Sequence, residues 1–100
     1  DMAKASVYIM NIEKKIYDKN VMPRCSHINI GSGKDITIKE LAEIIKEVIG
    51  FNGKIYFDQT KPDGSYRKFL DSKRLNNFGF TPKISLKNGL IKTYQDYTKF

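Results

Sequence analysis

Apolar side chains recur every three to four residues in three stretches of the chain, the spacing of an amphipathic helix. The first stretch covers residues 1–17, and the last runs from Ser85 to about Tyr97. The middle stretch is the best defined, because Thr37 and Glu40 form a capping box before it and Gly50 is placed to end it. Its apolar positions are Leu41, Ile44, Ile45, Val48 and Ile49. We expect this helix to be the main contributor to the core.

Two shorter runs have the character of strands. One is H-I-N-I at 27–30, followed by Gly31-Ser32-Gly33, and the other is I-Y-F at 55–57, within a strand expected at 54–58. A short helical turn through Leu75, capped by Asp71, and an apolar F-G-F plug at 78–80 complete the pattern. The sequence therefore predicts a small α/β fold with about three main helices and two to three short strands.

Composition limits the classes of function. The chain has 100 residues and a formal charge of +7, which suits one small domain or a piece of a larger one with an anionic partner. Cys25 is the only cysteine, so an internal disulfide is impossible and a reducing, cytoplasmic setting is expected. No apolar run is long enough for a membrane span, and no metal site is expected. Because the chain starts at Asp1 inside a helical pattern, we expect a fragment.

The candidate chemistry lies in the stretch at 55–71, in the loop that follows the expected strand, where one carboxylate stands among several cations. Asp63 follows Pro62 in a K-P-D-G turn, and Arg67 and Lys68 come just after it. A carboxylate can accept hydrogen bonds from ribose or a base edge, while Arg and Lys suit phosphate oxygens. This is the chemistry of a nucleotide-diphosphate site. From spacing alone, a solvated turn whose charges serve solubility is the favoured interpretation. Gly31 and Gly33 are interpreted as turn glycines, since Ile36 stands where a dinucleotide fingerprint needs glycine.

Several motifs together resemble one enzyme family. D-M-A-K-A-S at the start and H-I-N-I-G-S-G-K-D-I-T-I-K-E-L-A-E-I-I are similar to segments of extended short-chain dehydrogenases. The more specific stretch is F-D-Q-T-K-P-D-G-S-Y-R-K-F-L-D-S-K-R-L, followed by F-G-F, I-S-L-K-N-G-L and T-Y-Q-D-Y. That order resembles the GDP-L-fucose synthases, which are GDP-4-keto-6-deoxymannose 3,5-epimerase-4-reductases. The resemblance covers essentially the whole chain.

The resemblance implies that residues 1–100 are the C-terminal GDP-sugar-binding subdomain of an NADP-dependent epimerase and oxidoreductase. The family's Rossmann domain, which binds NADP and carries the catalytic Ser, Tyr and Lys, would be absent, so the fragment alone would be inactive. Asp63 matches the family's GDP-sugar-binding Asp, Lys68 matches a basic residue near the diphosphate, and Arg67 is its neighbour. Cys25 and His27 do not match the family's acid/base pair. The parent would be a homodimer, and the fragment would self-associate through apolar surface that the absent domain covers.

Three alternatives stay open at this point. The chain could belong to a UDP- or dTDP-sugar epimerase or dehydratase of the same superfamily, because one loop is a narrow basis for choosing the base. A small basic nucleic-acid-binding domain would explain the charge, although no nucleic-acid-binding motif occurs and no specific nucleic acid is expected. An inert structural fragment would bind nothing without its Rossmann partner.

Overall fold

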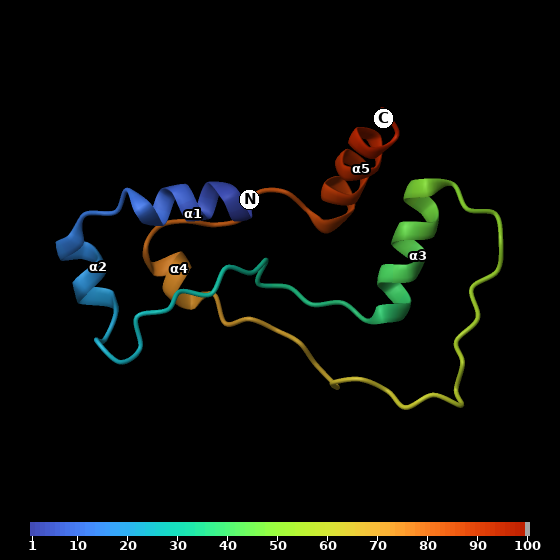
Figure 1. The fold of residues 1–100 in the computed structure, drawn as a ribbon, viewed down its shortest axis with the longest axis horizontal. Helices are drawn as coiled ribbons and strands as arrows, with labels where there is room; N and C mark the ends of the chain where they lie inside the picture. The colour runs from blue at the N-terminus through green and yellow to red at the C-terminus, as the bar shows by residue number, and fades with distance from the viewer. Residues whose placement is uncertain (100) are drawn as a thin grey trace. The chain divides into compact units, whose positions relative to one another are not determined.

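The computed structural model describes residues 1–99, and five helices form there (Figure 1). They are α1 (Met2–Met10), α2 (Lys14–Asn20), α3 (Ile38–Ile49), α4 (Lys73–Asn77) and α5 (Leu86–Tyr97). The chain divides into two compact units. The first unit combines Asp1–Asp35 with Lys68–Lys83 and holds α1, α2 and α4; the second combines Ile36–Arg67 with the chain from Ile84 on and holds α3 and α5. Within residues 1–99, no helix is long and apolar enough to cross a membrane.

The prediction of an α/β fold with short strands is wrong for residues 1–99, which form helices joined by irregular segments. The runs at 27–30 and 55–57 have the apolar residues that strands favour, but neither pairs with a neighbouring segment. A strand needs such a partner, because its backbone N–H and C=O groups bond across to the next strand. The pairing seen in the described part is an isolated antiparallel bridge between Met22 and Cys25. The fold is therefore helix-rich.

The single helix expected over residues 1–17 is also wrong, because the chain breaks between α1 and α2. The Asn11 side-chain amide donates to the carbonyl oxygen of Val7 at 2.7 Å, and Asn20 makes the same bond to Ile16 at 2.9 Å at the end of α2. Such bonds satisfy carbonyls that a helix end leaves without a backbone donor. The apolar period continues across the break, so periodicity alone could not show where α1 ends.

The start and end of α3 are confirmed. The Thr37 hydroxyl accepts from the backbone N–H of Glu40 at 3.1 Å, and the Glu40 carboxylate accepts from the backbone N–H of Thr37 at 2.8 Å. These bonds, the one from the Thr37 backbone above all, lower the pKa of Glu40. Gly50 ends the helix with a left-handed φ of 69°, which favours glycine. The start of α5 is confirmed too, because the Ser85 hydroxyl accepts from the Asn88 N–H at 3.2 Å.

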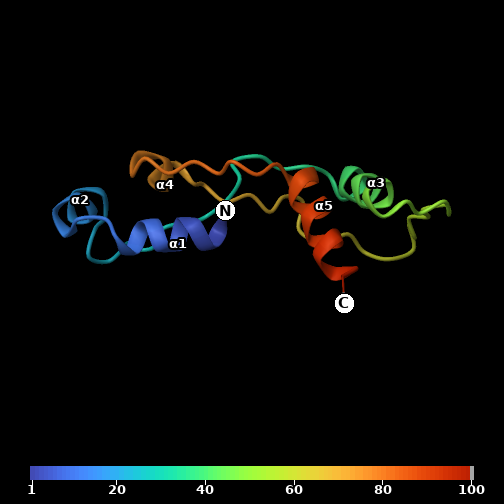
Figure 2. The ribbon, with the colours of Figure 1, turned by 90° about the horizontal axis from the view of Figure 1, so that it is seen from above.

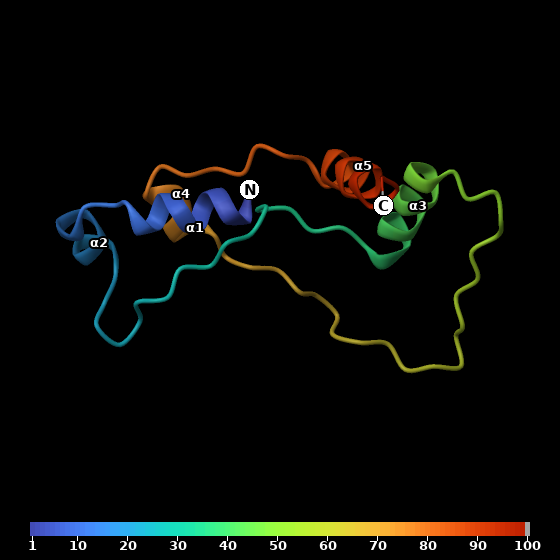
Figure 3. The same cartoon turned by 45° about the horizontal axis from the view of Figure 1, so that its top comes forward.

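Helix α3 packs against α5, and the two lie side by side in Figure 3. An ion pair between Lys87 and Glu47 joins them at 2.6 Å. The expectation that α3 is the main contributor to the core is wrong, because none of its side chains is fully buried and Ile45 and Ile49 stay exposed. One neighbouring helix covers only part of an apolar face that spans several turns.

In the part of the chain that the structure describes, the buried hydrophobic residues are Ala5, Leu75 and Phe78, all in the first unit, where α4 lies beside α1 (Figure 2). The Tyr8 hydroxyl donates to the carbonyl oxygen of Phe78 at 2.7 Å. The ring of Tyr17 stacks on that of Phe78 with 6.1 Å between centroids. Contacts of this kind stabilise beyond the apolar area they bury. The prediction of an apolar plug at 78–80 is confirmed for Phe78.

Candidate functional site

The candidate loop begins with a turn at Asp58, earlier than the sequence suggests. The Asp58 carboxylate accepts from the Thr60 hydroxyl at 2.6 Å and from the Thr60 backbone N–H at 3.0 Å. These two bonds, the hydroxyl first, lower the pKa of Asp58. The backbone N–H of Lys61 donates to the carbonyl oxygen of Asp58 at 3.4 Å and closes the turn. The Asp-x-Thr spacing is the signal that could have located this turn.

The three residues predicted to bind a nucleotide-sugar are all exposed on this loop. Asp63 and Arg67 belong to the second unit, whereas Lys68 begins the second stretch of the first unit. The three residues are therefore neighbours along the chain but do not all belong to one unit. Within residues 1–99, the side chains of Asp63 and Lys68 make no hydrogen bond or ion pair, so both remain available to a ligand.

Tyr66 is a candidate that the sequence analysis did not single out. It lies between Asp63 and Arg67, and its side chain is fully exposed. An aromatic ring with both faces open can stack on a nucleotide base. The sequence could have pointed to Tyr66, because this tyrosine stands between the residues proposed to bind the nucleoside and the diphosphate.

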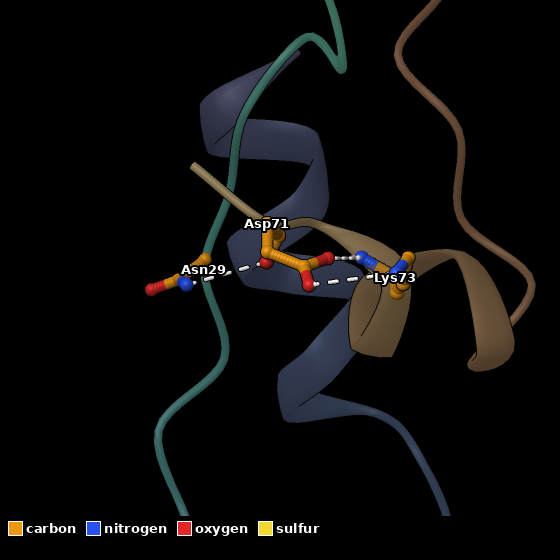
Figure 4. Close-up of polar contacts among 3 residues, drawn as sticks. All are labelled: Asn29, Asp71 and Lys73. Atoms are coloured by element: carbon orange, nitrogen blue, oxygen red, sulfur yellow. Dashed lines mark hydrogen bonds and ion pairs between the residues drawn. The ribbon is translucent and has the colours of Figure 1, made fainter. Parts of the chain in front are cut away.

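The C-terminal end of the loop is fastened to the segment that follows His27 (Figure 4). The Asn29 side-chain amide donates to the carbonyl oxygen of Asp71 at 3.2 Å. The Asp71 carboxylate accepts from the backbone N–H of Lys73 at 2.9 Å and lies 4.0 Å from its ammonium nitrogen. The Asp71 carboxylate therefore contacts the first N–H of α4, but the prediction that Asp71 caps this helix is wrong, because Ser72 is the N-cap residue and no side-chain cap bond forms. The helix continues to Asn77, beyond the expected end at Leu75.

A second contact joins the same two segments. Ser72 is 6% exposed, and its hydroxyl donates to the carbonyl oxygen of Gly31 at 3.3 Å. A Cβ atom added at Gly31 would lie 3.0 Å from the Ser72 hydroxyl oxygen and 3.1 Å from Cβ of Leu70. Such distances are shorter than ordinary van der Waals contacts, so the close approach favours glycine. The prediction that Gly31 is a turn glycine therefore misses its closest contacts, which are to residues far along the chain.

Arg74 adds the third contact. Its guanidinium donates to the carbonyl oxygens of Cys25 at 2.8 Å and His27 at 2.5 Å. The Cys25 sulfur lies 3.9 Å from Nδ1 of His27 and 3.6 Å from the second guanidinium nitrogen of Arg74. Both backbone bonds come from the same guanidinium nitrogen, Nη1, so Arg74 has a structural role here: it holds the backbone of residues 25–27.

A polar hollow of about 370 Å³ opens beside these contacts. It is lined by Asn20, His27, Asn29, Asp71, Lys73, Arg74 and Asn77. The described part of the chain contains no group of three or more His, Cys, Asp or Glu side chains placed to hold a metal ion.

Comparison with known proteins identifies the relatives of this chain. It is 47% identical to GDP-L-fucose synthase of Escherichia coli over 95 residues, which cover 95% of the chain. These 100 residues are homologous to a segment of GDP-L-fucose synthase. The matched segment is 30% of the E. coli enzyme, so the chain spans about a third of the length of this relative. No protein-family model matches the chain.

Solved structures of GDP-sugar reductases share the fold. A GDP-6-OMe-4-keto-L-xylo-heptose reductase from C. jejuni matches 99% of the chain with a TM-score of 0.85 and 34% identity. A GDP-mannoheptose C4 reductase from Campylobacter jejuni, solved with NADP bound, matches 98% with a TM-score of 0.78 and 32% identity. The chain covers 29% of each of these structures. By their names, the E. coli relative and these two structures are enzymes of GDP-sugars. A putative UDP-glucose 4-epimerase of Methanocaldococcus jannaschii is also 36% identical over 90% of the chain.

Proposed function

We propose that this chain is the GDP-sugar-binding part of an NADP-dependent epimerase and reductase that converts GDP-4-keto-6-deoxy-D-mannose to GDP-L-fucose. The observation that carries the proposal is the 47% identity with the E. coli GDP-L-fucose synthase over nearly the whole chain. The extended short-chain dehydrogenase fold of such enzymes would supply the NADP site and the catalytic Ser, Tyr and Lys from a Rossmann domain that these residues do not include. The chain by itself would then be inactive, and its parent a cytoplasmic homodimer.

Within this proposal, Asp63 accepts hydrogen bonds from the nucleoside, Lys68 places a point charge on the diphosphate, and Arg67 adds a second cation. The exposure of all three on one continuous loop supports these roles. A carboxylate and an ammonium group differ in what they recognise, so the pair distinguishes the nucleoside end of the ligand from its phosphates. Tyr66 adds a ring for the base.

A chimera tests the proposal. In E. coli GDP-L-fucose synthase, the stretch that matches this chain is replaced by residues 1–100. We expect the chimera to oxidise NADPH in the presence of GDP-4-keto-6-deoxy-D-mannose, because the inserted loop restores the GDP-sugar contacts. The measurement is NADPH absorbance with and without the sugar nucleotide.

Binding of NADPH is the control for the chimera, because it reports that the host domain has folded. A chimera that binds NADPH but turns over no GDP-sugar contradicts the proposal. If it accepts only a UDP- or dTDP-sugar, the chain belongs to the alternative epimerase class.

A further inference from the structure

The position of Lys68 depends on the backbone that follows it. Its side chain is exposed and makes no hydrogen bond or ion pair within residues 1–99. Lys68 opens the stretch Lys68–Lys83, which packs in the first unit together with Asp1–Asp35. Further along this stretch, Asp71 and Ser72 make polar contacts with Asn29 and Gly31.

Two hydrogen bonds and one close backbone approach join this stretch to residues 29–31. The Asn29 amide donates to the Asp71 carbonyl oxygen at 3.2 Å, and the Ser72 hydroxyl donates to the Gly31 carbonyl oxygen at 3.3 Å. Gly31 lets the two segments approach closely, since an added Cβ would crowd Ser72 and Leu70 at 3.0 and 3.1 Å. Ser72 is one of the most deeply buried polar residues of the chain at 6% exposure, so its hydrogen bond is shielded from competing water.

We propose that Asn29, Gly31 and Ser72 are positioning residues that hold Lys68 ready for the diphosphate of the sugar nucleotide. The inference rests on the proposed function. None of the three residues is proposed to touch the ligand; they act by fixing the backbone just beyond Lys68. A loop held in its binding conformation loses less conformational freedom when the ligand binds, and this raises affinity.

The first test is Asn29→Asp in the chimera. This change keeps the shape of the side chain but replaces the donor to the Asp71 carbonyl oxygen by an acceptor. We expect KM for the GDP-sugar to rise roughly three- to tenfold, the scale of one lost hydrogen bond, with kcat unchanged. Gly31→Ala is expected to shift KM in the same direction, because the added methyl group crowds Ser72.

Asn11→Asp is the matched control, because it removes a similar amide-to-carbonyl bond, to Val7, elsewhere in the first unit. A double-mutant cycle then separates positioning from general destabilisation. If Asn29 acts through Lys68, Asn29→Asp has little further effect on KM once Lys68→Met is present.

Each outcome of the test has a defined meaning. Non-additive effects of Asn29→Asp and Lys68→Met, with Asn11→Asp close to the unaltered chimera, support the inference. Additive effects, or an Asn11→Asp variant that raises KM as much as Asn29→Asp, overturn it and leave the proposed function standing. An unaltered chimera that binds NADPH and turns over no GDP-sugar overturns both.

Discussion

Leu75→Ala is expected to lower the free energy of unfolding of the first unit by about 2–5 kcal/mol. Leu75 is the largest side chain with no exposure, and it is one of three buried hydrophobic residues in the described part of the chain. Truncation leaves a cavity beside residues that have few other buried partners. Domains are stable by only about 5–15 kcal/mol, so this single change removes a large share. The measurement is urea denaturation followed by the NMR signal of the Ala5 methyl group, which is fully buried in the same unit.

Leu70→Ala is the control for this prediction, because it makes the same truncation in the same unit at a side chain that is 52% exposed. It should change stability by much less. Equal effects of the two variants would show that Leu75 is not part of a packed core.

The second large effect is expected on KM for the GDP-sugar, from substitutions in the loop that carries Asp63 and Lys68. In the chimera, Asp63→Ala and Lys68→Met should each raise KM for the GDP-sugar roughly tenfold to a hundredfold, the range for losing a hydrogen bond to a charged group. Because neither residue is proposed to act on the reacting carbons, kcat should change little. Steady-state kinetics with saturating NADPH measures both constants.

Lys61→Met is the control for the loop variants, since it removes a cation from the same loop at a position to which no ligand contact is assigned. It should leave KM close to that of the unaltered chimera. If Lys61→Met and Lys68→Met raise KM equally, the loop acts only through its summed charge and Lys68 has no specific role.

Local signals in the sequence were sufficient to predict where α3 begins and ends and where α5 begins. The capping box at Thr37 and Glu40, the left-handed Gly50 and the cap at Ser85 are each made by residues a few positions apart, so their chemistry is readable from the sequence. The break after α1 was missed although Asn11 stands at it, because the apolar period continues into α2.

Features that depend on distant partners could not be predicted in the same way. The run at 27–30 has strand-like composition, yet its structure is decided by whether another segment pairs with it. The core was assigned to α3 from its pattern, whereas burial depends on how many elements cover a face, and Leu75 and Phe78 are covered instead. Likewise, Asn29 and Ser72 carry no motif, and their contacts join residues about forty positions apart. The resemblance to GDP-L-fucose synthases located Asp63 and Lys68 on the loop, but it gave no indication of what anchors Lys68.

The most direct test of the account is an amide NMR titration of this chain with GDP and, under the same conditions, with UDP. If the loop is a half-site for a guanine nucleotide, GDP shifts the amide signals of Asp63, Gly64 and Lys68, and UDP shifts them much less. Equal shifts with both nucleotides would contradict base recognition by this chain. No shift with either nucleotide at millimolar concentration would contradict the claim that this chain binds the nucleotide by itself, and would favour the inert fragment that needs its Rossmann partner.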